Sequence, residues 1–196
     1  RTEEALNNCM EWLKDCHKLT EYEKSEIYCY IAMCHCNLNQ PSEGMKYIDA
    51  SLDLNPFNRS SIIQKGMLHL QLDENFEAES LFHKAIALSP SDEEAETHYA
   101  IVNTYFCLGR SVDIIRWCEK IIKEYPTEQK EALLFIANCY YEVNDITMCL
   151  KTLAVYWKIN NENIDDEAIN DKRFNGMFAY ITGTLNDTNF NLNDYL

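Results

Sequence analysis

The residues of this sequence most able to do chemistry are the Cys-His-Cys triplet at positions 34–36 and the Cys-His pair at positions 16–17. Thiolates and imidazoles are the usual zinc ligands, and they must converge on one ion. In a helix, side chains two residues apart point about 200° away from each other. Cys34 and Cys36 therefore do not converge, and we interpret both as packing groups in a core or groove. Cys16 and His17 also diverge, and no third group orients them as a nucleophile and base.

A calcium loop is the other metal motif that the chain partly matches. Asp187, Asn189 and Asn191 have its first three spacings, but Leu192 stands where the loop needs glycine. The sequence contains no Gly-rich phosphate loop, no His-Glu-x-x-His motif and no nucleophile elbow. We therefore expect no enzymatic activity, no cofactor and no bound metal.

The composition favours long helices joined by short turns. The 196 residues are 46% hydrophobic, enough for a substantial core, and include only 5 Gly and 4 Pro, too few for a turn-rich β-sandwich. The net charge of -15 would repel phosphate backbones, so no nucleic-acid partner is expected. Nine cysteines, an odd number, are interpreted as reduced thiols.

No membrane insertion or secretion is expected. No apolar run approaches the ~20 residues that a membrane-spanning helix needs, and no apolar stretch follows Arg1 to form a signal peptide. These features predict a cytoplasmic or nuclear protein. The chain begins without an initiator Met, which indicates a fragment or a processed form of a longer protein.

An internal repeat predicts the fold. The segments ASLDLNP, KAIALSP and IIKEYP end at Pro56, Pro90 and Pro126, at intervals of 34 and 36 residues. A period of about 34 residues is that of a helix–turn–helix repeat, and proline after the second helix stops it. Polar or breaker residues mark the turn inside each expected pair, at 39–41, 73–75, 108–110 and 143–145.

Aligned on these prolines, the sequence resembles the tetratricopeptide repeat (TPR) family. The repeat from Arg59 is nearest to the family pattern: small Gly66 and Ala78 let two helices approach, and bulky Ile62 and Phe82 fill the space beside them. The fourth repeat departs from the pattern at Tyr156, where a small residue is usual. The resemblance implies an all-α fold, a right-handed superhelical solenoid of antiparallel helix pairs with three to four repeats plus flanking helices. His35 and His69 occupy a family tyrosine position and are expected to be ordinary interhelical histidines; stacking in adjacent repeats, with a shared metal or a pH switch, is the alternative.

The expected organisation has flanking helices at both ends of the repeats. Residues 3–18 are predicted to form one helix whose packed face carries Leu6, Cys9, Trp12, Leu13 and Cys16; residues 165–185 are predicted to form a capping helix with Phe174 on its apolar face. The expected boundaries are 1–24 for an N-terminal helix or partial repeat, 25–58, 59–92 and 93–128 for three repeats, 129–162 for a degenerate fourth, and 163–196 for the capping helix and a loose tail.

The TPR resemblance implies a concave groove lined by the first helix of each pair, where peptides or helices bind. Its expected lining is apolar, aromatic and thiol-rich, which suits a hydrophobic segment of a partner. The family's clamp for acidic chaperone tails is disfavoured, because Cys29, Met33 and Gln64 replace its polar groups. The twelve expected groove residues are Cys29, Met33, Cys36, Ile63, Met67, Leu70, Tyr99, Asn103, Phe106, Leu134, Asn138 and Tyr141.

The preferred function is a protein-interaction scaffold or adaptor that grips a hydrophobic peptide or helix of a partner. Two alternatives stay open: a secretion-type or assembly chaperone that shields a hydrophobic client, and the repeat region of a larger enzyme. An unsealed repeat edge would also allow a homodimer or a place as a subunit in a larger complex. The chain's own tail is an alternative occupant of the groove.

Overall fold

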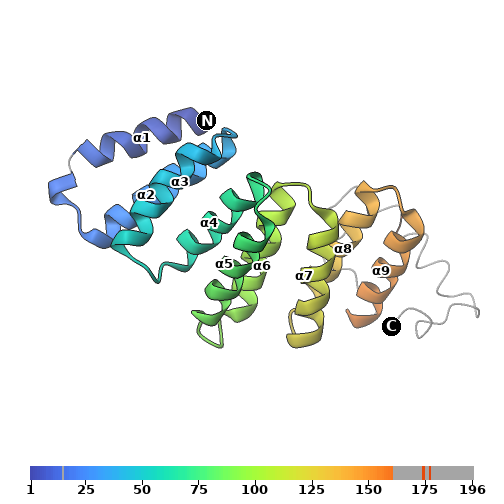
Figure 1. Cartoon of the computed structure of the whole chain (residues 1–196). Coiled ribbons are helices and arrows are strands. Elements are labelled where there is room, and N and C mark those ends of the chain that lie inside the picture. Colours follow the sequence, from blue (N-terminus) through green and yellow to red (C-terminus); the bar gives the residue numbers. More distant parts are fainter. Residues whose placement is uncertain (15, 161–173, 175–176, 178–196) are drawn as a thin grey trace, which may run out of the picture. The chain divides into compact units, whose positions relative to one another are not determined.

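The structure is a computed structural model that describes residues 1–14, 16–160, 174 and 177, without the side chain of Cys16. The described residues form α-helices and one short 3₁₀ helix and contain no strand, so the predicted all-α fold is confirmed. The chain divides into two compact units, Arg1–Leu108 and Gly109–Leu196, and Figure 1 labels the helices. The elements are α1 (Thr2–Lys14), η1 (Cys16–Lys18), α2 (Glu21–Asn37), α3 (Pro41–Leu54), α4 (Arg59–Gln71), α5 (Asn75–Ala87), α6 (Glu94–Cys107), α7 (Ser111–Glu124), α8 (Gln129–Glu142) and α9 (Ile146–Ile159).

Unit 1 is built from two helix pairs with one helix packed at each side. A three-residue turn joins α2 to α3, and another joins α4 to α5, so the partners in each pair run antiparallel. Helix α1 packs against α2, and α6 packs against α4 and α5. The first helices α2, α4 and α6 are neighbours in this order.

The four turns between the paired helices share one backbone conformation. Their second residue has a positive φ in every case: Asn39 at 56°, Asp73 at 61°, Gly109 at 66° and Asn144 at 59°. Asn, Asp and Gly are the residues that enter this left-handed region at least cost. The turns predicted at 108–110 and 143–145 are confirmed, and those predicted at 39–41 and 73–75 lie one residue earlier, at 38–40 and 72–74.

Local signals also set where the helices begin. Thr20 caps α2 through a capping box, in which Glu23 N–H donates to Thr20 Oγ1 and Thr20 N–H donates to the Glu23 carboxylate. Asn58 caps α4 by accepting a bond from Ser61 N–H. Pro41 is the first residue of α3, a position where its missing N–H costs nothing.

Close packing in unit 1 depends on two glycines. A Cβ added at Gly66 would lie 2.4 Å from Phe82 Cε1, and one at Gly44 would lie 2.9 Å from Leu68 Cδ2 and 3.1 Å from the Ala32 carbonyl oxygen. Helices α4 and α5 therefore meet where the sequence predicted a small residue beside a bulky one. Phe82 is fully buried and packs edge-on against Tyr105 of α6, with ring centroids 5.6 Å apart.

A buried layer of serines joins α2, α3 and α4. Ser51 Oγ donates to the Ser25 carbonyl at 2.8 Å and lies 2.8 Å from Ser61 Oγ. Asn58 Nδ2 lies 3.4 Å from Ser25 Oγ, and all three serines are fully buried. Each hydroxyl has a partner, so these small side chains are buried without the cost of an unsatisfied polar group.

Unit 2 packs α7 against α8 and α8 against α9. Helix α7 buries Ile114, Trp117, Cys118 and Ile121, which lie on one face at helical spacing. Tyr156, the departure from the family pattern in the fourth repeat, is fully buried in the core that α8 and α9 share with Phe174.

Two sequence expectations are corrected, and for His35 the interhelical expectation holds rather than its alternative. The helix predicted over 3–18 ends at Lys14, and a 3₁₀ helix follows from Cys16. Trp12 does not lie on the packed face: Cys9 is buried there, whereas 59% of Trp12 is exposed. His35 stacks on Tyr47 of α3, with ring centroids 5.4 Å apart, rather than on His69.

His35 and His69 each form a hydrogen bond across the turn that follows their own helix. His35 Nδ1 bonds to the Gln40 side chain, and His69 Nδ1 bonds to the Glu74 carboxylate. The predicted capping helix and tail lie outside the described residues, apart from Phe174 and Met177. Both of these residues pack against the core of unit 2. The repeat boundaries and the superhelical course of the whole array stay predictions.

Candidate functional site

Nine of the twelve expected groove residues lie in unit 1, on the neighbouring helices α2, α4 and α6. They differ in exposure. Met33, Asn103 and Phe106 are exposed, and Cys29 and Ile63 are half-buried. Cys36, Met67, Leu70 and Tyr99 are buried.

The buried members of this set hold helices together. Cys36 and Met67 belong to one core cluster with Ala32, Ile48 and Leu68, and Cys29 packs against its edge. The exposed or half-exposed part of the predicted lining in unit 1 is therefore smaller than expected. It consists of Met33, Cys29, Ile63, Asn103 and Phe106, which we call the inner face of unit 1.

The cations of α4 do not serve the inner face. Arg59 pairs with Glu93, and Lys65 pairs with Asp49 of α3 at 2.6 Å. The sequence of α6 contains no Lys or Arg. A carboxylate-binding clamp requires cations at such positions, and neither α4, whose cations are paired, nor α6 supplies them.

The remaining three groove residues lie on α8 in unit 2, where the chain covers part of the surface itself. Asn138 is buried, and Leu134 and Tyr141 are half-buried. The ring of Phe174 meets Tyr141 edge-on, with centroids 6.4 Å apart and an interplanar angle of 89°. Tyr141 thus packs against a residue from the C-terminal segment of the same chain.

Among the described side chains eight cysteines are free, and burial favours the protonated thiol of several of them. Burial raises the pKa of the Cys36 thiol to about 11, and it also raises the pKa values of Cys29 and Cys34. Cys36 packs toward α4 and Cys34 lies near Cys9 of α1, so the triplet diverges as its helical geometry requires. Among the described residues, no three His, Cys, Asp or Glu side chains are placed to hold a metal ion. Cys29, Cys34 and Cys36 therefore serve as packing groups, since burial disfavours their reactive thiolate forms.

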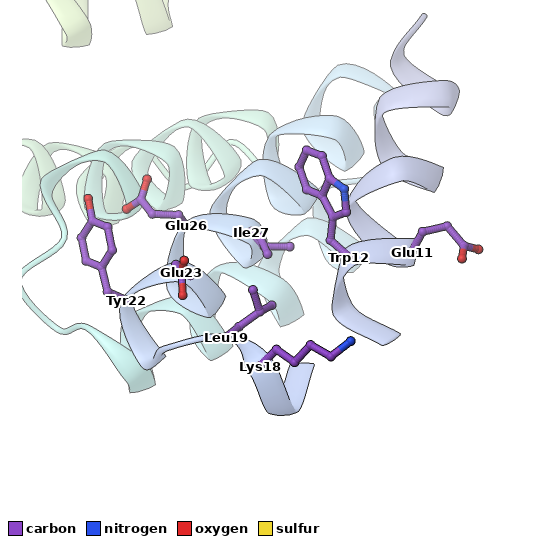
Figure 2. Close-up of a pocket in the computed structure, with 8 residues that line it drawn as sticks. All are labelled: Glu11, Trp12, Lys18, Leu19, Tyr22, Glu23, Glu26 and Ile27. Carbon is purple, nitrogen blue, oxygen red and sulfur yellow. The ribbon is translucent and has the colours of Figure 1, made fainter. Parts of the chain in front are cut away.

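Two pockets lie outside the predicted groove. One, of about 530 Å³, lies between α1 and α2 at the N-terminal end of unit 1 (Figure 2). The other, of about 510 Å³, lies in unit 2 among α7, α8 and α9, with Ile122, Ile136, Val155 and Ile159 in its apolar lining. The sequence analysis did not predict the pocket between α1 and α2, because it placed Trp12 on the packed face of its helix. The only available signal was the number of carboxylates close to Trp12 and Tyr22.

This chain combines three features: antiparallel helix pairs, three-residue turns that contain a residue with a positive φ, and small residues where two helices approach closely. The fold is TPR-like. No protein-family model matches the chain, and no curated protein matches it in sequence. No described helix is long and apolar enough to cross a membrane.

Two solved structures are similar in fold. The crystal structure of the MamA protein has a TM-score of 0.49 at 17% identity, covering 82% of this chain and 84% of MamA. The crystal structure of YrrB, a TPR protein with an unusual peptide-binding site, has a TM-score of 0.45 at 11% identity, covering 92% of this chain and 93% of YrrB. These values are too low to bear on function, and the fold assignment rests on the helix pairs themselves.

Proposed function

We propose that this protein is a non-enzymatic interaction scaffold that binds a hydrophobic segment of a partner protein on the inner face of unit 1. The observation that supports this proposal is the exposure of Met33 at 38% and Phe106 at 48% on first helices of the array. Cys29 and Ile63 add half-buried apolar area beside them. Burying apolar surface stabilises a complex by about 25 cal/mol per Å².

The chemistry of this face selects the kind of partner. Met and Cys side chains are soft and adapt to differently shaped apolar groups. The exposed amide of Asn103 offers both a donor and an acceptor to the backbone of a bound segment. Since the cations of α4 are already paired with carboxylates, an acidic segment would gain little here.

The test uses a variant that changes the inner face without touching the core. In Met33→Glu/Phe106→Glu, two exposed apolar side chains become charged. Met67 and Tyr99 are unsuitable because both are only 9% exposed, and a buried carboxylate there would unfold the unit. The matched control is Phe57→Glu/Phe76→Glu, which makes the same charge change at side chains that are 71% and 83% exposed outside the inner face.

Partners are captured by crosslinking from the native source and identified by mass spectrometry, and the bound segment is then titrated in purified form. We expect the inner-face variant to lose at least about tenfold in affinity, about 1.4 kcal/mol, while the control binds like the parent protein. Circular dichroism verifies that both variants are folded. Equal affinity of all three proteins for the segment would refute the proposal.

A further inference from the structure

The pocket between α1 and α2 exposes aromatic rings beside carboxylates. Trp12 is 59% exposed and Tyr22 is 64% exposed, both high for large rings that usually bury most of their area. Figure 2 shows Trp12 on one side of the pocket and Tyr22 on the other, with Leu19 and Ile27 between them. The pocket therefore has an apolar floor and aromatic sides.

Its charge is mainly negative. Glu23 and Glu26 line it together with Lys18, whereas Glu11, also in the lining, is paired with Lys14 at 2.5 Å. Hydrogen bonds from the backbone and side chain of Thr20 lower the pKa of Glu23, so this carboxylate is ionised at neutral pH. Glu26 accepts a bond from Asn58 Nδ2 at 2.6 Å. A carboxylate has about four acceptor positions, so Glu26 keeps capacity for another donor.

We propose that this pocket binds a basic segment of a partner protein through one arginine side chain. The aliphatic stem of the arginine covers Leu19 and Ile27, and its guanidinium group reaches Glu23 and Glu26. The planar guanidinium also stacks on aromatic faces such as those of Trp12 and Tyr22. This site is separate from the inner face and does not depend on the proposed function.

Other occupants fit the pocket less well. A purely apolar segment would remove the carboxylates of Glu23 and Glu26 from water without supplying a positive charge. A second copy of this chain carries a net charge of -15, which opposes association at an acidic surface. An arginine can cover the apolar floor with its aliphatic stem and pair with the carboxylates through its guanidinium group.

Tryptophan signals allow a direct test. Trp117 and Trp157 are buried, at 3% and 9% exposure, so Trp12 is the exposed tryptophan of the three and its indole N–H is a local reporter. The ¹⁵N-labelled protein is titrated with a capped peptide that carries one arginine between two leucines. The control peptide carries citrulline, which has nearly the same shape without the charge. We expect the Trp12 signal to shift to saturation with the arginine peptide and the citrulline peptide to bind at least about tenfold more weakly.

A pair of charge-matched variants separates this site from the general acidity of the protein. Glu26→Gln removes a pocket carboxylate but keeps an acceptor for Asn58, whereas Glu77→Gln removes an exposed carboxylate at the start of α5. We expect Glu26→Gln to raise the Kd of the arginine peptide about five- to tenfold and Glu77→Gln to leave it unchanged. Equal binding of the two peptides, equal effects of the two variants, or a Trp12 signal that does not move would overturn the proposal. Neither variant replaces an inner-face residue, and the readout at Trp12 is separate from the affinity measured in the scaffold test.

Discussion

Replacing Gly66 by alanine tests the close approach of α4 and α5. Two effects oppose each other. Alanine is favoured over glycine inside a helix by about 0.8–1.0 kcal/mol. The added Cβ, however, would lie 2.4 Å from Phe82 Cε1 and 3.0 Å from Cδ1 and Cζ. Since carbon atoms normally approach to about 3.5–4.0 Å, the ring would have to move by about 1 Å.

The surroundings of Phe82 leave little room for that movement. The ring is fully buried and packs against Tyr105, whose hydroxyl donates to Glu79 at 2.6 Å. Overpacking a core costs about 1–3 kcal/mol, and a displaced aromatic pair belongs at the upper end of that range. After the gain in helix propensity is subtracted, we expect Gly66→Ala to destabilise unit 1 by about 2 kcal/mol.

Urea unfolding followed by far-UV circular dichroism measures this change, and hydrogen exchange locates it in α4, α5 and α6. A second variant identifies the cause: Phe82→Leu removes the ring carbons that clash. Gly66→Ala/Phe82→Leu should be less destabilised than the sum of the two single variants by about 1 kcal/mol. A neutral or stabilising Gly66→Ala, or strict additivity in the double variant, would refute the reasoning.

Three further predictions follow from the thiols and the capping box of α2. Cys107 is exposed, whereas burial raises the pKa of Cys118 far above its ordinary value and so suppresses its thiolate. In a reaction with iodoacetamide at pH 8, followed by peptide mass spectrometry, Cys107 should be modified before Cys118. Equal rates of modification would contradict the burial of Cys118. Thr20→Ala should cost about 1 kcal/mol in urea unfolding through the lost cap of α2. Because the folded pKa of Glu23 is lowered, its stabilising effect is present above the unfolded pKa and is lost as pH falls through the folded pKa. The difference in urea midpoint between the parent protein and Glu23→Gln should therefore shrink from pH 7 to pH 3, and an unchanged difference would contradict the role of its charge.

The candidate site shows where sequence reasoning reached its limit. Spacing on α2, α4 and α6 placed Met33, Asn103 and Phe106 on an accessible surface, and their exposure is consistent with that prediction. The same spacing also selected Cys36 and Met67, which the structure buries between helices. Periodicity indicates the direction of a side chain from its own helix axis, but the neighbouring helix decides whether solvent remains in that direction.

Trp12 is the opposite case. The pattern of α1 grouped it with Cys9 and Leu13, yet α2 covers Cys9 and leaves Trp12 mostly in solvent. His35 is similar, because its stacking partner Tyr47 comes from α3 and not from the equivalent position of the next repeat. Contacts between helices depend on their distance and crossing, which no single-helix pattern contains.

The sequence by itself determined the all-α class, the helix pairs and the positions of the turns. These features depend on local physics: proline stops a helix, Asn, Asp and Gly enter the left-handed region, and small residues permit close approach. Only the tertiary structure decided which groove residues stay exposed, that Phe174 packs on Tyr141, and that Trp12 and Tyr22 line a pocket rich in carboxylates. Those outcomes depend on which surfaces meet across the chain, and burial is a property of the packed unit rather than of any one of its helices.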